Sequence, residues 1–143
     1  MTATPPERLP LQGIRVADFT HVISGPFCTQ MLGDLGAEVT KIESIDGGDI
    51  GRGMGPDVNG QSHYFTAFNR NKRSIALDLK DPRGHAAALE LAARADVVIE
   101  NFAPGVIARL GLGYEAVKAV NPGVVFCSIS GFGQSGPLAN KRS

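Results

Sequence analysis

Residues 14–43 read IRVADFTHVISGPFCTQMLGDLGAEVTKIE, and this stretch predicts a strand, a turn, a helix and a second strand. The run Ile14–Phe19 is mostly apolar and lies between a glycine and the polar pair Thr20-His21, which is typical of a buried strand. We expect the helix to begin at Pro26. Proline lacks an N–H group, and at the first position of a helix that group would have no hydrogen-bond partner. The stretch therefore predicts a strand-helix-strand unit.

The expected helix places its apolar residues on one face at helical spacing, namely Phe27, Cys28, Met31, Leu32 and Leu35. Gly36 can adopt the left-handed conformation that ends a helix, and Ala37–Ser44 then forms the second strand. Two strands joined by a helix lie parallel, and ligands of such sheets bind beyond the carboxyl ends of the strands. His21 lies at the end of the first strand, so we single it out among the three histidines.

The rest of the chain repeats this alternation of strands and helices. The expected strands are 74–80, 96–102 and 124–130, and the expected helices are 82–95, 104–111 and 114–120. The Asp81-Pro82 pair marks the start of the first of these helices, and the Gly-rich segment 45–62 is expected to be a long surface loop. The pattern predicts an α/β fold with a Rossmann-like, mainly parallel sheet and flanking helices.

Two segments after the loop allow more than one interpretation. Residues 63–68, HYFTAF, hold three aromatic residues that we expect to anchor the end of the loop in the core. The run Asn69–Arg73 is the most basic in the chain and precedes the expected strand 74–80. It is either a solvated turn or a contact for phosphate.

Length and composition indicate one ordinary domain. The chain has 143 residues, of which 43% are hydrophobic and 20% charged, and its net charge of zero argues against a nucleic-acid partner. No apolar run approaches the roughly 20 residues of a membrane helix. Residues 1–10 are expected to be a flexible lead before the domain at 11–143, and without the apolar centre of a signal peptide they favour a cytoplasmic protein.

Other sequence features give no site. Cys28 and Cys127 lack metal-ligand spacing and are expected to be reduced core thiols, so no metal site is predicted. Gly131–Gly136, GFGQSG, matches the dinucleotide-binding pattern, but Pro137 follows at once and no amphipathic helix opens. The histidines share no motif with a nucleophile and an acid, so no catalytic triad is predicted.

Four ordered blocks of the sequence resemble the family III CoA-transferases of the CaiB/BaiF type, and the formyl-CoA transferases in particular. The blocks are DFTHVISGPFCTQMLGDLGAEVTKIE, YFTAFNRNKRSIALDLK, ADVVIENFAPGVIARLG and NPGVVFCSISGFGQSGP. The resemblance runs from Leu11 to the end of the chain, which is similar to the N-terminal part of the larger family fold.

The resemblance implies an enzyme that moves CoA from an acyl-CoA thioester to a small carboxylic acid, within an interlocked homodimer. It implies covalent catalysis by an aspartate expected downstream of Ser143, so no catalytic residue is named here and the chain alone is expected to be inactive. Coenzyme A is then a substrate, and no prosthetic group is implied. The alternatives are an enzyme resembling the 2-methylacyl-CoA racemases and a CoA-binding module without catalysis.

The contacts with CoA that the resemblance implies fall on Ile23, Ser24, Leu77, Asp78, Leu79, Lys80, Asn101, Phe102, Ala103 and Arg109. Lys80 and Arg109 can meet phosphates through charge-assisted hydrogen bonds. Two positions differ from the formyl-CoA transferases: Ile23 stands where they have a glutamine, and Ser44 stands where they have a CoA-binding arginine. These differences leave the acyl donor open.

Overall fold

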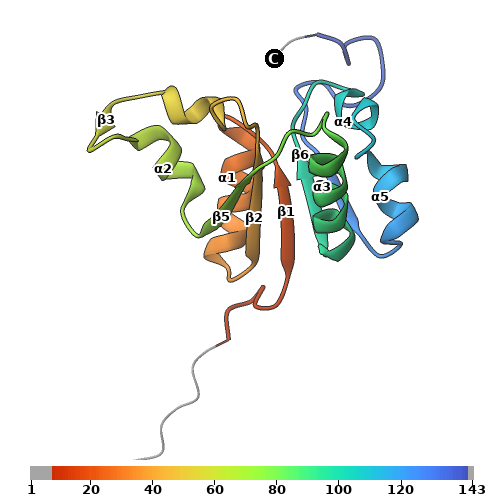
Figure 1. The fold of residues 1–143 in the computed structure, drawn as a ribbon, viewed down its shortest axis with the longest axis horizontal. Helices are drawn as coiled ribbons and strands as arrows, with labels where there is room; N and C mark the ends of the chain where they lie inside the picture. The colour runs from red at the N-terminus through yellow and green to blue at the C-terminus, as the bar shows by residue number, and fades with distance from the viewer. Residues whose placement is uncertain (1–7, 142–143) are drawn as a thin grey trace, which may run out of the picture.

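The computed structural model describes residues 8–141, which form one five-stranded sheet with helices on both faces (Figure 1). Its strands are all parallel and follow the order β5-β2-β1-β6-β7. They are β1 (Arg15–Phe19), β2 (Glu38–Glu43), β5 (Lys72–Ala76), β6 (Val97–Glu100) and β7 (Val125–Ser128). The predicted α/β fold with a mainly parallel sheet is confirmed.

Short elements link these strands. The α-helices are α1 (Ser24–Asp34), α2 (His63–Asn69), α3 (Pro82–Arg94), α4 (Val106–Arg109) and α5 (Tyr114–Val120). The segment between β2 and α2 contains a 3-10 helix, η1 (Ile50–Gly53), and the antiparallel hairpin of β3 (Asp57–Val58) and β4 (Gln61–Ser62). The predicted loop at 45–62 therefore contains short regular elements, and its glycines together with Asn59 supply the turns between them.

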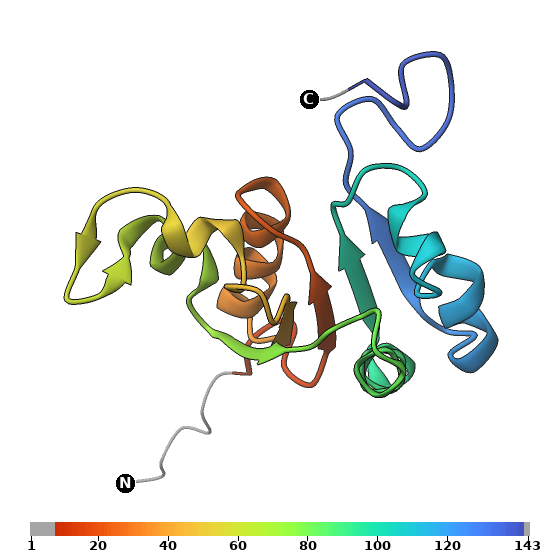
Figure 2. The ribbon, with the colours of Figure 1, turned by 45° about the horizontal axis from the view of Figure 1, so that its top comes forward.

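Alternate residues of β1 point into two separate apolar layers. Val16 packs on the face that holds α1, whereas Ala17 and Phe19 pack on the face that holds α3 and α5 (Figure 2). All three are at most 2% exposed. Because β1 pairs with β2 on one side and β6 on the other, it is the central strand, and its carboxyl end lies in the middle of one edge of the sheet.

Helix α1 differs from the prediction in its start and in the face it buries. It begins at Ser24, since the Phe27 amide already donates to the Ile23 carbonyl at 2.8 Å. Cys28 and Leu32 are half-buried against the core, but the rest of the predicted apolar face, Phe27, Met31 and Leu35, is 44–48% exposed. The residues that α1 buries are Gly25, Pro26, Thr29, Gln30 and Gly33.

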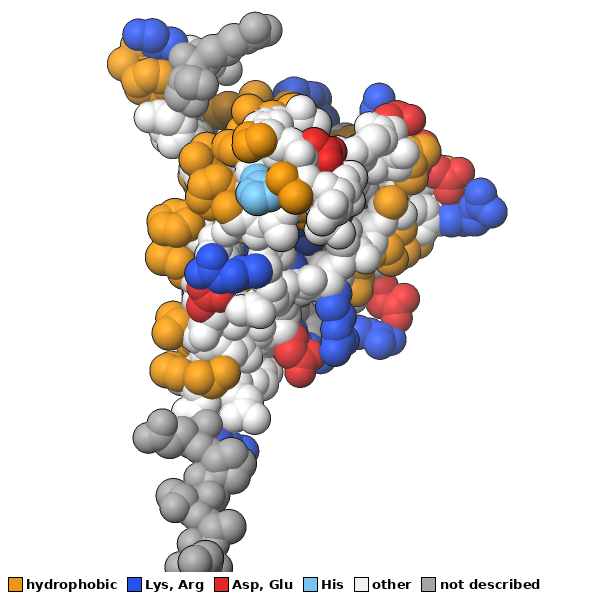
Figure 3. Space-filling view, turned by 90° about the vertical axis from the view of Figure 1, so that its left-hand side faces the viewer, with side chains coloured by type: hydrophobic (Ala, Val, Ile, Leu, Met, Phe, Trp, Pro, Cys, Tyr) orange, Lys and Arg blue, Asp and Glu red, His pale blue; other side chains and the backbone are white. Residues whose placement is uncertain are grey.

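A buried charge explains this orientation of α1. Thr29 Oγ1 donates to Asp18 Oδ2 at 2.6 Å, and the carbonyl of Pro26 accepts from Lys72 Nζ at 2.9 Å. Turning the polar face of α1 inward gives these buried groups hydrogen-bond partners. Leaving them unpaired would cost more free energy than burying the apolar face would contribute. The hydrophobic side chains left outside are partly exposed to solvent. Figure 3 shows hydrophobic side chains gathered along one margin of the molecule.

The aromatic segment 63–68 is a helix with no buried residue, so the predicted anchor in the core is wrong. Its rings pack on neighbouring surface elements instead. Phe68 makes edge-to-face contacts with Tyr64 and with Phe27 of α1, and the Arg52 guanidinium lies 3.8 Å from the centroid of the Phe65 ring. These contacts fasten α2 and η1 to the outside of α1.

The strand predicted at 74–80 is displaced towards the N-terminus. It is the edge strand β5, its last four residues are exposed, and the basic residues Lys72 and Arg73 lie within it rather than before it. Residues 77–80 follow as a turn, in which Leu77 and Leu79 still pack against the core. The strand ends early because its neighbour β2 ends at Glu43, whose carbonyl accepts the Leu77 amide at 2.9 Å.

The predicted cap of α3 and two predicted helix-ending glycines are confirmed, whereas the helix predicted at 104–111 begins only at Val106. Asp81 caps α3 by accepting the Arg83 amide at 2.9 Å, and Gly36 and Gly111 have positive φ angles of 102° and 72°. With 13 residues, α3 is the longest helix in the part of the chain described, so none of its helices could span a bilayer.

Cys28 and Cys127 are half-buried free thiols beside the α1 core, and burial raises the pKa of Cys28.

Candidate functional site

Two cavities open beyond the carboxyl ends of the parallel strands. The first cavity, of about 470 Å³, lies between the ends of β1 and β2 and the turn Leu77–Lys80. The second cavity, of about 640 Å³, lies between the turn His21–Ser24, the segment 101–104 and the residues that follow β7. Both occupy the edge of the sheet where ligands of parallel α/β folds bind.

His21 and Phe102 line both cavities and form the boundary between them. Their ring centroids are 5.4 Å apart, with the planes tilted by 48°. Phe102 lies two residues after the end of β6, and its amide donates to Glu100 Oε2 at 2.8 Å, which fixes the start of this segment. The cavities are therefore adjacent halves of one crevice.

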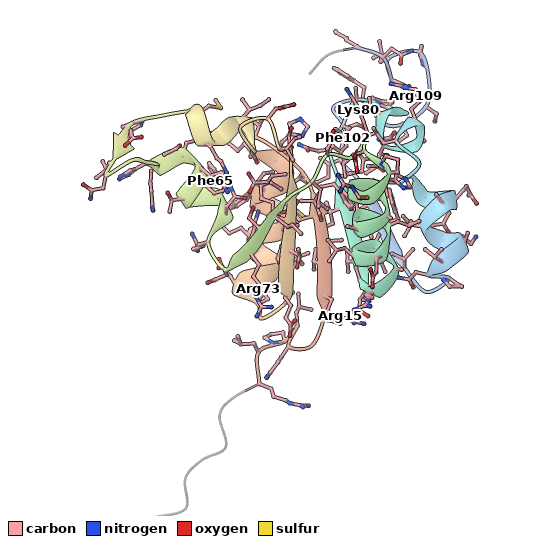
Figure 4. The ribbon with its side chains drawn as sticks, viewed as in Figure 1. Arg15, Phe65, Arg73, Lys80, Phe102 and Arg109 are labelled. Atoms are coloured by element: carbon pink, nitrogen blue, oxygen red, sulfur yellow. The ribbon has the colours of Figure 1, made fainter. Side chains whose placement is uncertain are left out.

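The predicted site residues divide between these halves. The first cavity is lined by Leu77, Asp78, Leu79, Lys80 and Phe102. The second is lined by Ile23, Ser24, Asn101, Phe102 and Ala103. Arg109 lines neither cavity; it is the last residue of α4 and lies with Lys80 and Phe102 at this end of the molecule (Figure 4).

The turn Leu77–Lys80 is held by a close approach of α3. A Cβ atom on Gly84 would lie 2.1 Å from the Asp78 carbonyl oxygen, so only glycine fits in this first turn of the helix. The Asp78 carboxylate accepts the amide of Lys80 at 2.9 Å. The turn is thereby fixed with its Lys80 side chain exposed to solvent.

The side chain of Asn101 forms its hydrogen bonds within the protein. Its Oδ1 accepts the His21 amide and its Nδ2 donates to the His21 carbonyl, both at 2.9 Å. The amide group therefore ties the end of β6 to the turn after β1. A ligand contact at Asn101 would have to use its backbone or accompany the loss of these bonds.

The basic run Asn69–Arg73 does not reach the crevice. Arg70 pairs with Asp34 at 2.6 Å, and Lys72 is buried and lies 3.2 Å from Asp18. Arg73 is exposed, and Figure 4 shows it at the opposite end of the sheet from Lys80. Burial lowers the pKa of Lys72 to about 8, although Asp18 opposes this shift. The structure thus supports neither interpretation for Lys72, which serves as an internal counter-charge.

Sequence reasoning missed a set of buried charges behind the crevice. Lys41 is fully buried, and its ammonium lies 2.8 Å from Asp49 Oδ2. Glu43 accepts two hydrogen bonds from Arg52, at 2.6 and 2.7 Å, and one from the Asp49 amide at 2.8 Å. The available signal was a charge at an inward position of an apolar strand, which requires a buried partner.

Burial and these charges together shift the pKa values of two groups near the crevice. Burial raises the pKa of Asp49, but Lys41 and the amides of Val22 and Gly51 outweigh it, and the pKa is lowered. For His21 burial is the largest effect and lowers the pKa, while Asp49 acts in the opposite direction. His21 is therefore neutral at pH 7, and Asp49 is ionised.

The fold and the crevice define the class of protein: an α/β fold with an open crevice beyond the carboxyl edge of its parallel sheet. Over residues 11–143 the sequence matches CoA-transferase family III, so the chain belongs to this family. It is 50% identical over 133 residues to the succinyl-CoA:glutarate CoA-transferase of Mus musculus, covering 92% of this chain and 30% of the mouse protein.

Two further comparisons agree. The chain is 51% identical over 124 residues to the formyl-CoA:oxalate CoA-transferase of Bradyrhizobium sp. (strain ORS 278), covering 86% of this chain and 29% of that protein. Its fold matches the crystal structure of a CaiB/BaiF family protein from Brucella suis with a TM-score of 0.90 and 45% identity, covering 95% and 37% of the two chains. The chain thus spans about a third of the length of these relatives.

Proposed function

We propose that this chain supplies the CoA-binding crevice of an enzyme that transfers CoA from an acyl-CoA thioester to a carboxylic acid. The observation that carries the proposal is the convergence of separate segments. The turn after β1, the turn Leu77–Lys80 and the segment after β6 lie far apart in the sequence yet line one crevice. Membership of CoA-transferase family III supports the same reaction class.

An extended ligand suits the two adjacent cavities. CoA has a nucleotide end with phosphates and a long arm that ends in the thiol. We propose that the exposed cations Lys80 and Arg109 bind the phosphates, because neither forms an ion pair with another residue in the range 8–141. The thioester would then lie near Ile23 and Ser24.

The acid acceptor is proposed to be a small dicarboxylic acid. The two relatives described above are named for glutarate and for oxalate, both of which carry two carboxylates.

The resemblance implies that an aspartate beyond Ser143 takes the acyl group and then the CoA in covalent form. This chain would contribute binding and orientation of the CoA thioester. An interlocked homodimer remains part of the proposal.

Calorimetric titration with CoA tests the binding role of Arg109. Arg109→Ala should weaken binding by about 1.5–3 kcal/mol, the range for hydrogen bonds to charged groups, which is roughly 10- to 150-fold in Kd. Arg73→Ala is the matched control, because it removes an exposed arginine at the opposite end of the sheet. Equal Kd values for the Arg109→Ala variant and the unaltered protein would remove Arg109 from the site.

An exchange assay tests the reaction. The full-length protein, including the segment beyond Ser143 that is proposed to hold the aspartate, is incubated with succinyl-CoA and either glutarate or oxalate, and new thioesters are separated by chromatography. Formation of a new acyl-CoA supports transfer to a dicarboxylic acid. CoA binding without any exchange would favour the non-catalytic alternative, and inversion of a 2-methylacyl-CoA without exchange would favour the racemase alternative.

A further inference from the structure

The turn between β1 and α1 contains a strained residue. Val22 has a φ angle of 69°, in the left-handed region that a β-branched side chain disfavours. Such a conformation persists only where the surroundings impose it. The next two residues, Ile23 and Ser24, line the second cavity, so this conformation decides where they lie.

Three side chains from other segments hold the backbone of this turn. Lys41 Nζ of β2 donates to the Thr20 carbonyl at 2.6 Å. The side chain of Asn101 accepts from the N–H and donates to the carbonyl of the next residue, His21. Consecutive residues of the turn are thus fixed by groups from β2 and from the end of β6.

The third contact acts on the strained residue itself. Asp49 Oδ1 accepts the Val22 amide at 3.0 Å and the Gly51 amide at 2.8 Å. Asp49 is 4% exposed and is held in turn, since its own amide donates to Glu43 and its Oδ2 lies 2.8 Å from Lys41. A carboxylate fixed in this way can impose a conformation on the turn.

We propose that Asp49 is a positioning residue, which holds Val22 in its left-handed conformation and thereby places Ile23 and Ser24 for the CoA thioester. The inference rests on the proposed function for the identity of the ligand. It goes beyond that function by assigning a role to a residue that is not among the predicted CoA contacts. Asp49 acts through the backbone of Val22.

The relevant comparison is the effect of Asp49→Ala in two backgrounds. With Val22 present, the loss of the Asp49 carboxylate lets the turn leave its strained conformation. Fewer molecules then have the turn arranged for binding, so the apparent Kd for CoA rises. We expect about a tenfold rise in the Kd for CoA. In a Val22→Gly background glycine adopts a positive φ without strain, so the same substitution should change the Kd less than threefold.

This rescue separates positioning from general stabilisation of the fold. Equal fold changes in the two backgrounds would overturn the proposal, because a structural role of Asp49 does not depend on the strain at Val22. If Asp49→Ala does not fold, Asp49→Asn is compared in the same two backgrounds, because it keeps the shape of the side chain but weakens the charge-assisted bond to the Val22 amide. The same pattern with a smaller rise in Kd is expected, and equal changes in the two backgrounds would overturn the proposal.

Amide hydrogen exchange gives a readout that does not require CoA. Asp49→Ala should accelerate exchange of the Val22 amide at least tenfold while leaving the amide of Val98, in the buried strand β6, unchanged. Unaltered protection at Val22 would refute the clamp. If the unaltered protein fails to bind CoA in calorimetry, the proposed function is wrong, and the exchange result still decides whether Asp49 holds the turn.

Discussion

Replacing Glu43 with glutamine should destabilise the protein in a manner that depends on pH. The Glu43 side chain is 3% exposed and accepts hydrogen bonds from Arg52, Ser74 and the Asp49 amide. Burial alone raises its pKa, but these hydrogen bonds outweigh burial and lower the pKa from 4.5 to about 2. Glu43→Gln keeps the shape of the side chain and removes its charge.

The magnitude follows from the shift in pKa between the unfolded and folded states. A fall from 4.5 to about 2 corresponds to roughly 3 kcal/mol, at about 1.36 kcal/mol per unit. Because the Arg52 side chain is 43% exposed, solvent screening reduces this to about 2 kcal/mol. The folded-state pKa is depressed, so the stabilisation is complete above pH 4.5 and is lost as the pH falls towards 2.

Urea unfolding followed by far-UV circular dichroism measures this difference, since the chain has no tryptophan to report by fluorescence. Glu43→Gln should lower the free energy of unfolding by about 2 kcal/mol at pH 7, and the gap should shrink by more than half at pH 3. Glu90→Gln is the control, because the pair of Glu90 with Arg94 is largely exposed and should contribute less than about 0.5 kcal/mol. A gap that is equal at pH 7 and pH 3 would refute the reasoning.

Two further substitutions test the turn and the second cavity. A Cβ atom on Gly25 would lie 2.3 Å from the Thr20 side chain, so Gly25→Ala should cost about 1–3 kcal/mol of stability in thermal unfolding, and an unchanged Tm would show that α1 can move away. If Ile23 lies near the reacting acyl group, Ile23→Gln should shift the relative rates of acyl-CoA donors towards formyl-CoA. The same ranking of donors in both proteins would contradict that placement.

Local signals in the sequence were sufficient for most of the element boundaries. Gly36 and Gly111 end helices because a left-handed residue is needed there, and Asp81 begins α3 because a carboxylate can cap its first amides. These effects involve neighbouring residues, so the sequence alone reveals them. The parallel order of the sheet follows from the helical crossovers between strands.

Effects between distant residues could not be predicted in the same way. The inward face of α1 depends on Lys72, which lies 46 residues beyond Pro26, so the pattern of apolar residues in the helix gave the wrong orientation. The strain at Val22 has no sequence signal, because valine is among the residues least suited to that conformation. The segments of the crevice were predicted by resemblance, but the hydrogen bonds between the Asn101 side chain and the His21 backbone were not.

The central place of β1 also affects how the protein is made. Its partner on one side, β2, begins at residue 38, whereas its partner on the other side, β6, begins at residue 97. At a synthesis rate of roughly 5–20 residues per second, about 4–16 s separate the emergence of β1 from that of β6. During this interval the middle strand of the future sheet has an open edge that can pair with another nascent chain. Substitutions that loosen α1 or β2 should therefore reduce the yield of protein during translation, even where the finished fold tolerates them.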